Sequence, residues 1–265
     1  MSEFIHHQTA HCENGVTMSL LQHHGVDFMT EPLAFGMGSG LFYIHIPFMK
    51  VNNGPAISFR TMPGAIFKRT CKSLDVKVER RKFKDPKEAT RFLDEKIAQG
   101  IKVGCQVGVF HLPYFPKEYR FHFNAHNLIV FGKEDDRYLV SDPVMEITTS
   151  LSVEELERVR FAKGALAPKG HIYYPVHIGN ITQEQIRRGI QKGIKRNCRD
   201  MLKIPGGIAG VKGIVHTSKK IRTWREKLGP RQAGLHLGQI VRMQEEIGTG
   251  GGGFRFLYAA FLEEA

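Results

Sequence analysis

The pattern of apolar and polar positions divides the chain into two parts. Up to about Pro175, apolar runs rich in β-branched and aromatic residues, at 40–46, 126–131 and 138–140, are mixed with one or two helical stretches. After about Ile178 such runs become rare and helical spacing takes over. We therefore expect an α+β first part followed by a mostly α-helical second part.

The second part contains several helix signals. Thr182 and Gln185 have the spacing of a capping box, which predicts a basic helix from there through Leu202. A Pro-Gly-Gly sequence at 205–207 should interrupt the helical pattern. A further helix is expected over residues 218–228.

The last stretch, from Phe254 to Ala265, also has apolar residues at helical spacing. Neither a cap nor a partner segment follows this apolar stripe, so we expect the helical domain to be incomplete at its C-terminal end. The predicted division is an α+β domain over residues 1–177 and a helical domain over residues 178–265.

Composition indicates a folded protein of the cytoplasm. The chain has 265 residues, of which 42% are hydrophobic, enough for one large core or two smaller ones. No run reaches the ~18 apolar residues of a membrane span, so we expect a soluble protein. The four cysteines form no CxxC pair and no apolar signal stretch opens the chain, which indicates a reducing, cytoplasmic location.

The net charge of +12 lies in one segment. Residues 187–231 contain fourteen Lys and Arg but only Asp200 and Glu226 as acids, so the rest of the chain is neutral overall. Such a segment could bind nucleic acid, an anionic membrane surface or an acidic protein, or form a solvated helical face. Its only aromatic residue is Trp224, which argues against stacking on nucleic-acid bases, so no nucleic-acid partner is expected.

Cys12 lies just before a helix-like stretch, residues 16–24, that Gly25 can close. At a helix N-terminus the unpaired amide groups and the positive end of the dipole favour thiolate over thiol. A lone cysteine is more often a small buried apolar residue, so its position alone does not identify a nucleophile.

A predicted β-hairpin brings in two partners for such a nucleophile. An apolar run begins at His126, a polar turn follows near Glu134, and a second run ends at Asp142 before Pro143. With the turn centred near Glu134, Asp142 lies opposite His126 and can accept the imidazole N–H, whereas a one-residue slip would separate them. Cysteine, histidine and a polar third residue in this order are typical of papain-like enzymes.

Two other kinds of site have weaker support. Histidines crowd the N-terminus, and His7 and His11 could share a helix face, but no HExxH motif is present and no metal site is expected. The glycine-rich turn from Gly36 to Gly40 could let the backbone approach a substrate closely. It lacks the GxGxxG spacing of a dinucleotide site, so no nucleotide cofactor is expected.

Several segments resemble a known family. Residues 9–16, 20–25 and 34–43 resemble the N-terminal domain of butirosin biosynthesis protein H, and residues 109–114, 122–126 and 138–143 resemble its histidine and aspartate segments. Residues 207–224 and 250–258 are similar to the helical domain that commonly follows in this family. The resemblance covers nearly the whole chain.

This resemblance implies a papain-like fold and the transfer of an acyl group from an acyl-carrier-protein thioester to an amine, forming an amide. It also implies Cys12 as nucleophile, His126 as base and Asp142 as orienting residue. The implied partners are an acyl carrier protein and an amine-bearing small molecule, without a cofactor. Papain-like peptidases usually carry a glutamine six residues before the cysteine, where this chain has His6 and the nearest glutamine is Gln8. The second donor of the oxyanion hole is therefore unassigned.

Further residues follow from these expectations. Substrate contacts are expected from Gly36, Gly38, Gly40 and Tyr114. Carrier proteins are typically acidic, so Lys219, Lys220 and Arg222 are expected to dock the carrier. Two alternatives stay open: the same triad in a peptidase, amidase or thioesterase that hydrolyses its substrate, and a basic nucleic-acid-binding protein. The second alternative predicts steeply salt-dependent binding to DNA.

Overall fold

The computed structural model describes residues 4–51, 54–247 and 249–265. Backbone contacts group the chain into two compact units, each made of two separate stretches. Unit 1 combines the residues up to Glu31 with Leu74–Ile181, and unit 2 combines Pro32–Ser73 with Thr182–Ala265. The α+β class expected from the sequence is confirmed.

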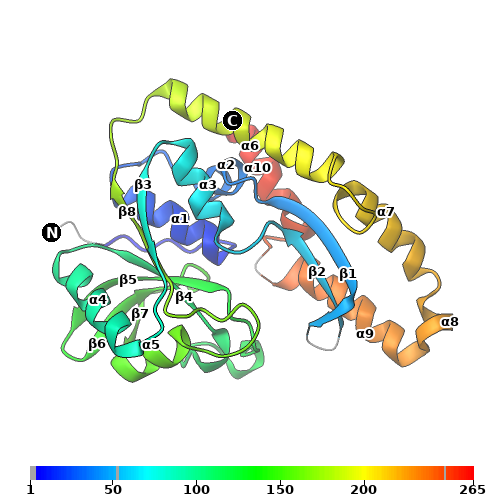
Figure 1. Ribbon diagram of the computed structural model, residues 1–265, viewed down its shortest axis with the longest axis horizontal. Helices are drawn as coiled ribbons and strands as arrows, with labels where there is room; N and C mark the ends of the chain where they lie inside the picture. Colours follow the sequence, from blue (N-terminus) through cyan, green and yellow to red (C-terminus); the bar gives the residue numbers. More distant parts are fainter. Residues whose placement is uncertain (1–3, 52–53, 248) are drawn as a thin grey trace. The chain divides into compact units, whose positions relative to one another are not determined.

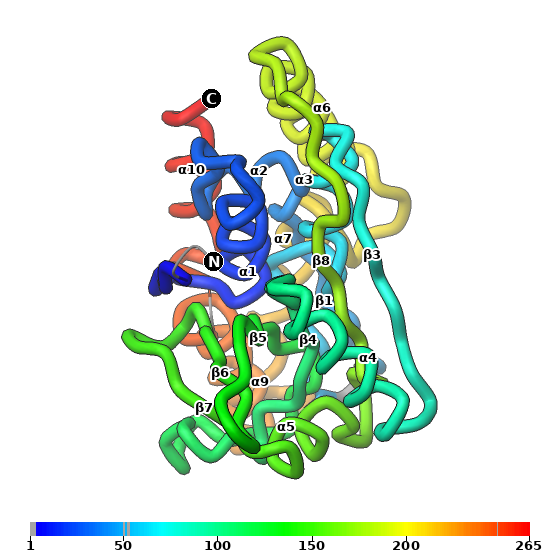
Figure 2. The backbone as a smooth tube through the Cα atoms, turned by 90° about the vertical axis from the view of Figure 1, so that its left-hand side faces the viewer, coloured from blue at the N-terminus to red at the C-terminus, as the bar shows by residue number. Residues whose placement is uncertain are grey.

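Unit 1 is built on a six-stranded sheet of order β3-β8-β4-β5-β6-β7, whose neighbouring strands are antiparallel (Figure 1). The strands are β3 (Lys77–Arg81), β4 (Val103–Val107), β5 (His126–Glu134), β6 (Arg137–Ser141), β7 (Thr149–Ser152) and β8 (Ile172–His177). Helices α1 (Cys12–Gln22), α4 (Pro86–Ala98) and α5 (Val153–Arg160) and the short turns η1 (Val109–His111) and η2 (Lys117–Tyr119) complete it. Figure 2 shows β3 and β8 side by side at one edge of the sheet.

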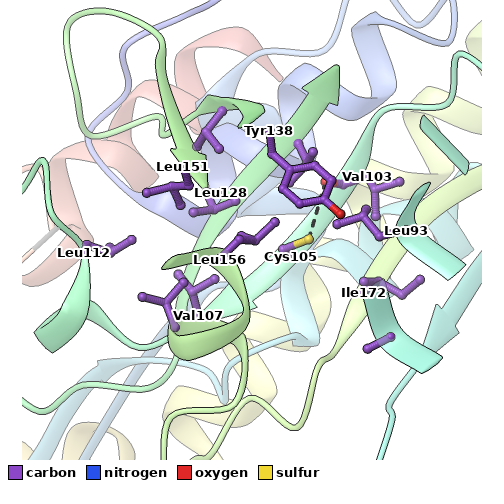
Figure 3. Packing of buried hydrophobic residues seen from close by; sticks show 14 of the residues in the cluster. Leu93, Val103, Cys105, Val107, Leu112, Leu128, Tyr138, Leu151, Leu156 and Ile172 are labelled. Atoms are coloured by element: carbon purple, nitrogen blue, oxygen red, sulfur yellow. Dashed lines mark hydrogen bonds between the residues drawn. The ribbon is translucent and has the colours of Figure 1, made fainter. Parts of the chain in front are cut away.

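The two faces of this sheet are covered by different helices. Leu128 of β5 points to one face, where it packs with Leu93 of α4 and Leu156 of α5 in a large hydrophobic core (Figure 3). Because side chains alternate along a strand, Asn127 points to the other face, where α1 packs on β5. Helix α1 is enclosed, and every residue from Cys12 to Leu21 is buried.

Gly15 lets α1 approach the chain that leaves the sheet after β6. A β-carbon at this position would overlap Thr9 and Pro143. The backbone N–H of Thr9 donates to the carbonyl of Pro143 at 2.6 Å. The beginning of α1 is therefore packed directly against the Asp142-Pro143 segment.

Unit 2 contains an antiparallel hairpin of β1 (Leu41–Val51) and β2 (Gly54–Arg60) with helices around it (Figure 1). The helices are α2 (Glu31–Met37), α3 (Ala65–Ser73), α6 (Gln183–Leu202), α7 (Gly210–Ile221), α8 (Trp224–Leu228), α9 (Pro230–Val241) and α10 (Arg255–Glu264). A π-helical turn η3 (Arg242–Glu246) and a short turn η4 (Gly252–Phe254) lie between the last two. In the described ranges of either unit, no helix is long and apolar enough to cross a membrane.

The grouping of residues 32–73 differs from the predicted division at residue 177. Phe59 of β2 and Ile66 of α3 share a hydrophobic core with Phe254 and Leu257 from the end of the chain. These apolar contacts place the hairpin with the C-terminal helices. They join segments that are far apart in the sequence, so no local pattern reports them.

The helix predictions were partly correct. The capping box is present, with the Thr182 and Gln185 side chains each bonded to the other's backbone at the start of α6, and α10 occupies the stretch expected at the C-terminus. The helix expected over residues 218–228 is instead divided into α7 and α8, with Arg222 as the C-cap of α7. Helix α9 had not been predicted.

Candidate active site

Cys12 is the first residue of α1 and is 6% exposed. His11 caps the helix in an extended conformation, and its Nδ1 accepts from the backbone N–H of Asn14 at 3.4 Å. The sulfur therefore lies at the positive end of a buried helix, where the dipole stabilises a negative charge.

A partly buried carboxylate fixes the backbone that enters this helix. The N–H groups of Ala10 and His11 donate to Oε2 and Oε1 of Glu31 at 2.9 and 2.8 Å. Burial raises the pKa of Glu31, although these two hydrogen bonds oppose the shift. Sequence analysis had missed Glu31, because nothing in its local sequence shows that it binds the backbone beside Cys12.

His126, the first residue of β5, connects Cys12 to Asp142. Its Nε2 lies 2.7 Å from Oδ2 of Asp142, and because a carboxylate only accepts, Nε2 carries the proton. The ring also interacts with Cys12, which leaves Nδ1 as the nitrogen for the sulfur. Burial acts to lower the pKa of His126, but Asp142 and Cys12 outweigh it and raise this pKa to about 10. The structure thus brings the three predicted residues together.

The hairpin that carries His126 and Asp142 has a different register from the predicted one. Glu134 pairs with Arg137, so the turn follows Glu134 instead of being centred on it. If the pairing of Glu134 with Arg137 continued unchanged along both strands, Asp142 and His126 would lie on opposite faces of the sheet.

A β-bulge in β5 restores the shared face. The extra residue is Phe131, and beyond it Ile129 pairs with Ser141. Continued by one residue, this pairing places Asp142 and His126 on one face as diagonal neighbours rather than directly opposed residues. A carboxylate and an imidazole can bridge that diagonal.

Asp142 is fully buried and its two carboxylate oxygens accept hydrogen bonds from three groups. The backbone N–H of Val144 donates to Oδ1 at 3.2 Å. The hydroxyl of Tyr114 donates to Oδ2 at 2.8 Å, the same oxygen that His126 approaches. The structure directs the Tyr114 hydroxyl to Asp142, and the contact between Tyr114 and substrate stays a prediction.

Asn127, which sequence analysis had also missed, follows His126 and points to the α1 face. Its Nδ2 lies 3.8 Å from Sγ of Cys12 and donates to the carbonyl of Ala125 at 3.1 Å. Its Oδ1 accepts from the hydroxyl of Tyr173 at 2.8 Å, which fixes the orientation of the amide. The only local signal was its position directly after the histidine.

His6 occupies the position where papain-like peptidases usually have glutamine. Its Nδ1 lies 2.8 Å from Oγ of Ser141, and its Nε2 lies 3.0 Å from the carbonyl oxygen of Met145. Both ring nitrogens are thus engaged by the segment that contains Asp142. Gln8 is exposed.

The other predicted site residues lie in unit 2. A β-carbon at Gly36, Gly38 or Gly40 would overlap Phe261, Ile66 or Phe35 respectively, so these three glycines permit close packing inside the unit. Lys219 and Lys220 are exposed in the last turn of α7, and Arg222 is exposed at its C-cap.

The histidines at the N-terminus do not form a metal site in the part of the chain that the structure describes. No group of three or more His, Cys, Asp or Glu residues there could hold a metal ion. The residues before Cys12 are not helical, so His7 and His11 do not share a helix face.

Comparisons with known proteins place this geometry in a family. The family model described as butirosin biosynthesis protein H, N-terminal, matches residues 11–143, and a domain of unknown function, DUF4872, matches residues 154–265. No curated protein matches the chain.

Two solved structures are similar at 14% identity. One is described as a C39-like peptidase from Bacillus anthracis, with a TM-score of 0.45 over 68% of this chain and 98% of that chain. The other is the peptidase domain of Streptococcus ComA, a bi-functional ABC transporter involved in quorum sensing, with a TM-score of 0.40 over 65% of this chain and 98% of that chain.

The range of the first family model contains Cys12, His126 and Asp142. A cysteine at the start of a buried helix, facing a histidine on an antiparallel strand, is also the arrangement of papain-like cysteine enzymes. The resemblance noted in the sequence is therefore confirmed. The chain belongs to the butirosin biosynthesis protein H family, with the N-terminal domain of that family over residues 11–143 and the DUF4872 domain after it.

Proposed function

We propose that this protein transfers an acyl group from an acyl-carrier-protein thioester to an amine, through an acyl-enzyme on Cys12. The observation that carries the proposal is the hydrogen-bonded series of Cys12, His126 and buried Asp142, found within the range of the family model. Such a series keeps a thiolate beside an imidazolium, which is the state needed to attack a thioester.

In the first half of the cycle, the Cys12 thiolate attacks the thioester carbonyl carbon. The new bond to Sγ forms, and the bond to the carrier sulfur breaks as His126 gives its proton to that sulfur. The oxyanion that forms between these events needs two donors. We assign them to the backbone N–H of Cys12 and the Nδ2 group of Asn127, which lies 3.8 Å from Sγ.

In the second half, an amine attacks the Cys12 thioester. Neutral His126 takes a proton from the amine nitrogen, the bond to Sγ breaks, and the thiolate and imidazolium are restored. Thioester exchange is nearly balanced in free energy, whereas the amide is much more stable than the thioester. Amide formation therefore drives the transfer.

The same residues would also support a hydrolase, which is the alternative function. If water replaces the amine in the second half, the protein is a thioesterase, and if an amide replaces the thioester in the first half, it is a peptidase or amidase. Nothing in the triad itself distinguishes these substrates, so the product must be identified.

Intact-mass measurement with a panel of acyl thioesters tests the proposal. Cys12 should gain one acyl group, and added amines should remove it as an amide. Cys198 is the exposed cysteine, so Cys198→Ala is the matched control and should still form the adduct, whereas Cys12→Ala should not. Release of free acid at the same rate with and without amines would favour the hydrolase, and acylation of Cys198 alone would exclude the proposal.

We further propose that the basic segment of unit 2 recruits the carrier protein. On α7, the exposed side chains of Val211, Ile214 and Val215 lie among exposed lysines, including Lys212 and Lys219. An apolar patch with a cationic border suits the acidic surface of a carrier. Salt dependence that is confined to the carrier-bound donor tests this part separately from the chemistry at Cys12.

A further inference from the structure

The hydroxyl of Tyr114 and the imidazole of His126 bind the same oxygen of Asp142. The two distances to Oδ2 are 2.8 Å from the tyrosine and 2.7 Å from Nε2. We propose that Tyr114 is a positioning residue that limits how strongly Asp142 stabilises the His126 imidazolium, and so sets the pH range in which the Cys12–His126 pair works. This inference rests on the acid–base pair in the proposed function.

The loop that carries Tyr114 is fixed by an arginine. Nε of Arg120 donates to the carbonyl of Phe115 at 2.7 Å, and an Nη group donates to the carbonyl of Pro113 at 2.6 Å. These carbonyls flank Tyr114 on both sides, so the guanidinium holds its backbone in place. The ring of Phe115 packs edge-on against the imidazole of His126, with centroids 5.4 Å apart. One short loop therefore contacts both Asp142 and His126.

The tyrosine hydroxyl remains a neutral donor at the pH of an assay. Burial first, and the charge of Asp142 second, hold the pKa of Tyr114 well above its ordinary value. An O–H donor on Oδ2 withdraws negative charge from that oxygen. The oxygen therefore stabilises the His126 imidazolium less strongly. It also restrains rotation of the carboxylate, whose other oxygen is held by the N–H of Val144.

Removing the Tyr114 hydroxyl should therefore shift the titration of His126 to higher pH. In Tyr114→Phe, Oδ2 serves His126 alone, so the imidazolium becomes more stable and loses its proton at higher pH. The loss of one hydrogen bond to a charged group should raise this alkaline inflection by about 0.5 to 1 pH unit. A tyrosine that only fills space would leave the inflection where it is.

The experiment follows the rate of Cys12 alkylation by iodoacetamide from pH 5 to 11, with peptide mass spectrometry to separate Cys12 from the other cysteines. The inflection that belongs to His126 is the one that His126→Ala removes. This reading needs no acyl donor, so a failure of the acyl-transfer proposal and a failure of the present inference give different results.

Tyr119→Phe is the matched control, because Tyr119 lies in the same loop and is 65% exposed. We expect Tyr114→Phe to raise the inflection and Tyr119→Phe to keep the wild-type profile. Arg120→Gln, which loosens the loop while Tyr114 is retained, should raise it by a smaller amount. If Tyr114→Phe folds and its alkaline inflection lies at the wild-type pH, the inference is wrong. If Tyr114→Phe does not fold, a wild-type inflection in Arg120→Gln leads to the same conclusion.

Discussion

The candidate site of unit 1 and helix α7 of unit 2 use ionisable residues in opposite ways. In unit 1, Asp142 is fully buried and His126 is 5% exposed, and each has a fixed partner. In unit 2, Lys212, Lys219 and Lys220 are exposed on α7. Buried charges have strong, geometry-dependent interactions that shift pKa values, whereas exposed charges act weakly over longer distances and are screened by salt.

This difference predicts two kinds of mutational effect. Substitutions in the buried network of unit 1 should change the chemical step or its pH dependence and be insensitive to salt. Substitutions of the exposed cations in unit 2 should change the encounter with a charged partner and depend on salt.

Cys12→Ala should abolish both the acyl-enzyme and amide formation. The variant removes the only atom of the site that can form the covalent bond, while alanine keeps helix α1 intact. Steady-state turnover and intact mass measure the loss, and circular dichroism checks the fold. Wild-type turnover by this variant would contradict the assignment of the nucleophile.

His126→Ala should lower kcat/KM by roughly 10²- to 10⁴-fold, the range of a lost general base. Asp142→Asn should lower it less, because the change disturbs the orientation and tautomer of His126 but leaves the imidazole in place. Single-turnover rates with a saturating small thioester report the chemical step. Equal activity of Asp142→Asn and wild type would show that Asp142 has no part in it.

Only part of this site could be predicted from the sequence. The order of Cys12, His126 and Asp142 and the hairpin could be identified, because a strand, a turn and a helix N-terminus are encoded by adjacent residues. The bulge at Phe131 could not, since its signal is a pairing between strands and not a residue pattern. The predicted register, with Asp142 directly opposite His126, was wrong. Asp142 shares a sheet face with His126 only because of that bulge.

The contacts that support the site could not be predicted for a related reason. Glu31 accepts from the backbone beside Cys12 and Tyr114 donates to Asp142, and both contacts join residues that are distant in the chain, which no local pattern reveals. The same holds for residues 32–73, whose apolar side chains belong to the core of unit 2. Local patterns predicted the elements, but not which of them pack together.

The pairing of His126 with Asp142 should also make stability depend on pH. The pKa of His126 is raised in the folded protein, so the folded state keeps a proton that the unfolded chain releases above pH ~6.5. The stabilisation is therefore complete below pH ~6.5 and is lost as pH rises through the folded-state pKa, which is about 10 when Cys12 contributes.

Because Cys12 also contributes to the raised pKa of His126, the comparison is best made without it. The free energy of unfolding of Cys12→Ala should fall by up to about 1.4 kcal/mol per pH unit above neutral pH relative to Cys12→Ala with Asp142→Asn. Urea unfolding at several pH values measures both proteins. Parallel pH profiles of the two variants would show that Asp142 does not raise the pKa of His126.

The smallest expected effect concerns the exposed cations of unit 2. Reversing Lys219, Lys220 and Arg222 to Glu should lower kcat/KM for a carrier-bound thioester about 10-fold at low salt, because charge steering acts on the encounter rate. An acyl-N-acetylcysteamine has no acidic surface to steer and should be used at the wild-type rate. For the wild type, added salt should likewise slow only the carrier-bound donor, since the Debye length is ~10 Å at 0.1 M.

The matched control for this reversal places the same charge change in unit 1. Lys82, Lys84 and Lys87 are exposed near the start of α4, and reversing them to Glu alters the net charge by the same amount. If only the α7 variant loses the carrier-bound donor, the effect is local to that surface and not one of total charge. Equal losses in both triple variants would assign the effect to net charge. Equal loss of both donors in the α7 variant would instead mean that this segment supports the structure or the site itself, and the docking proposal would then be wrong.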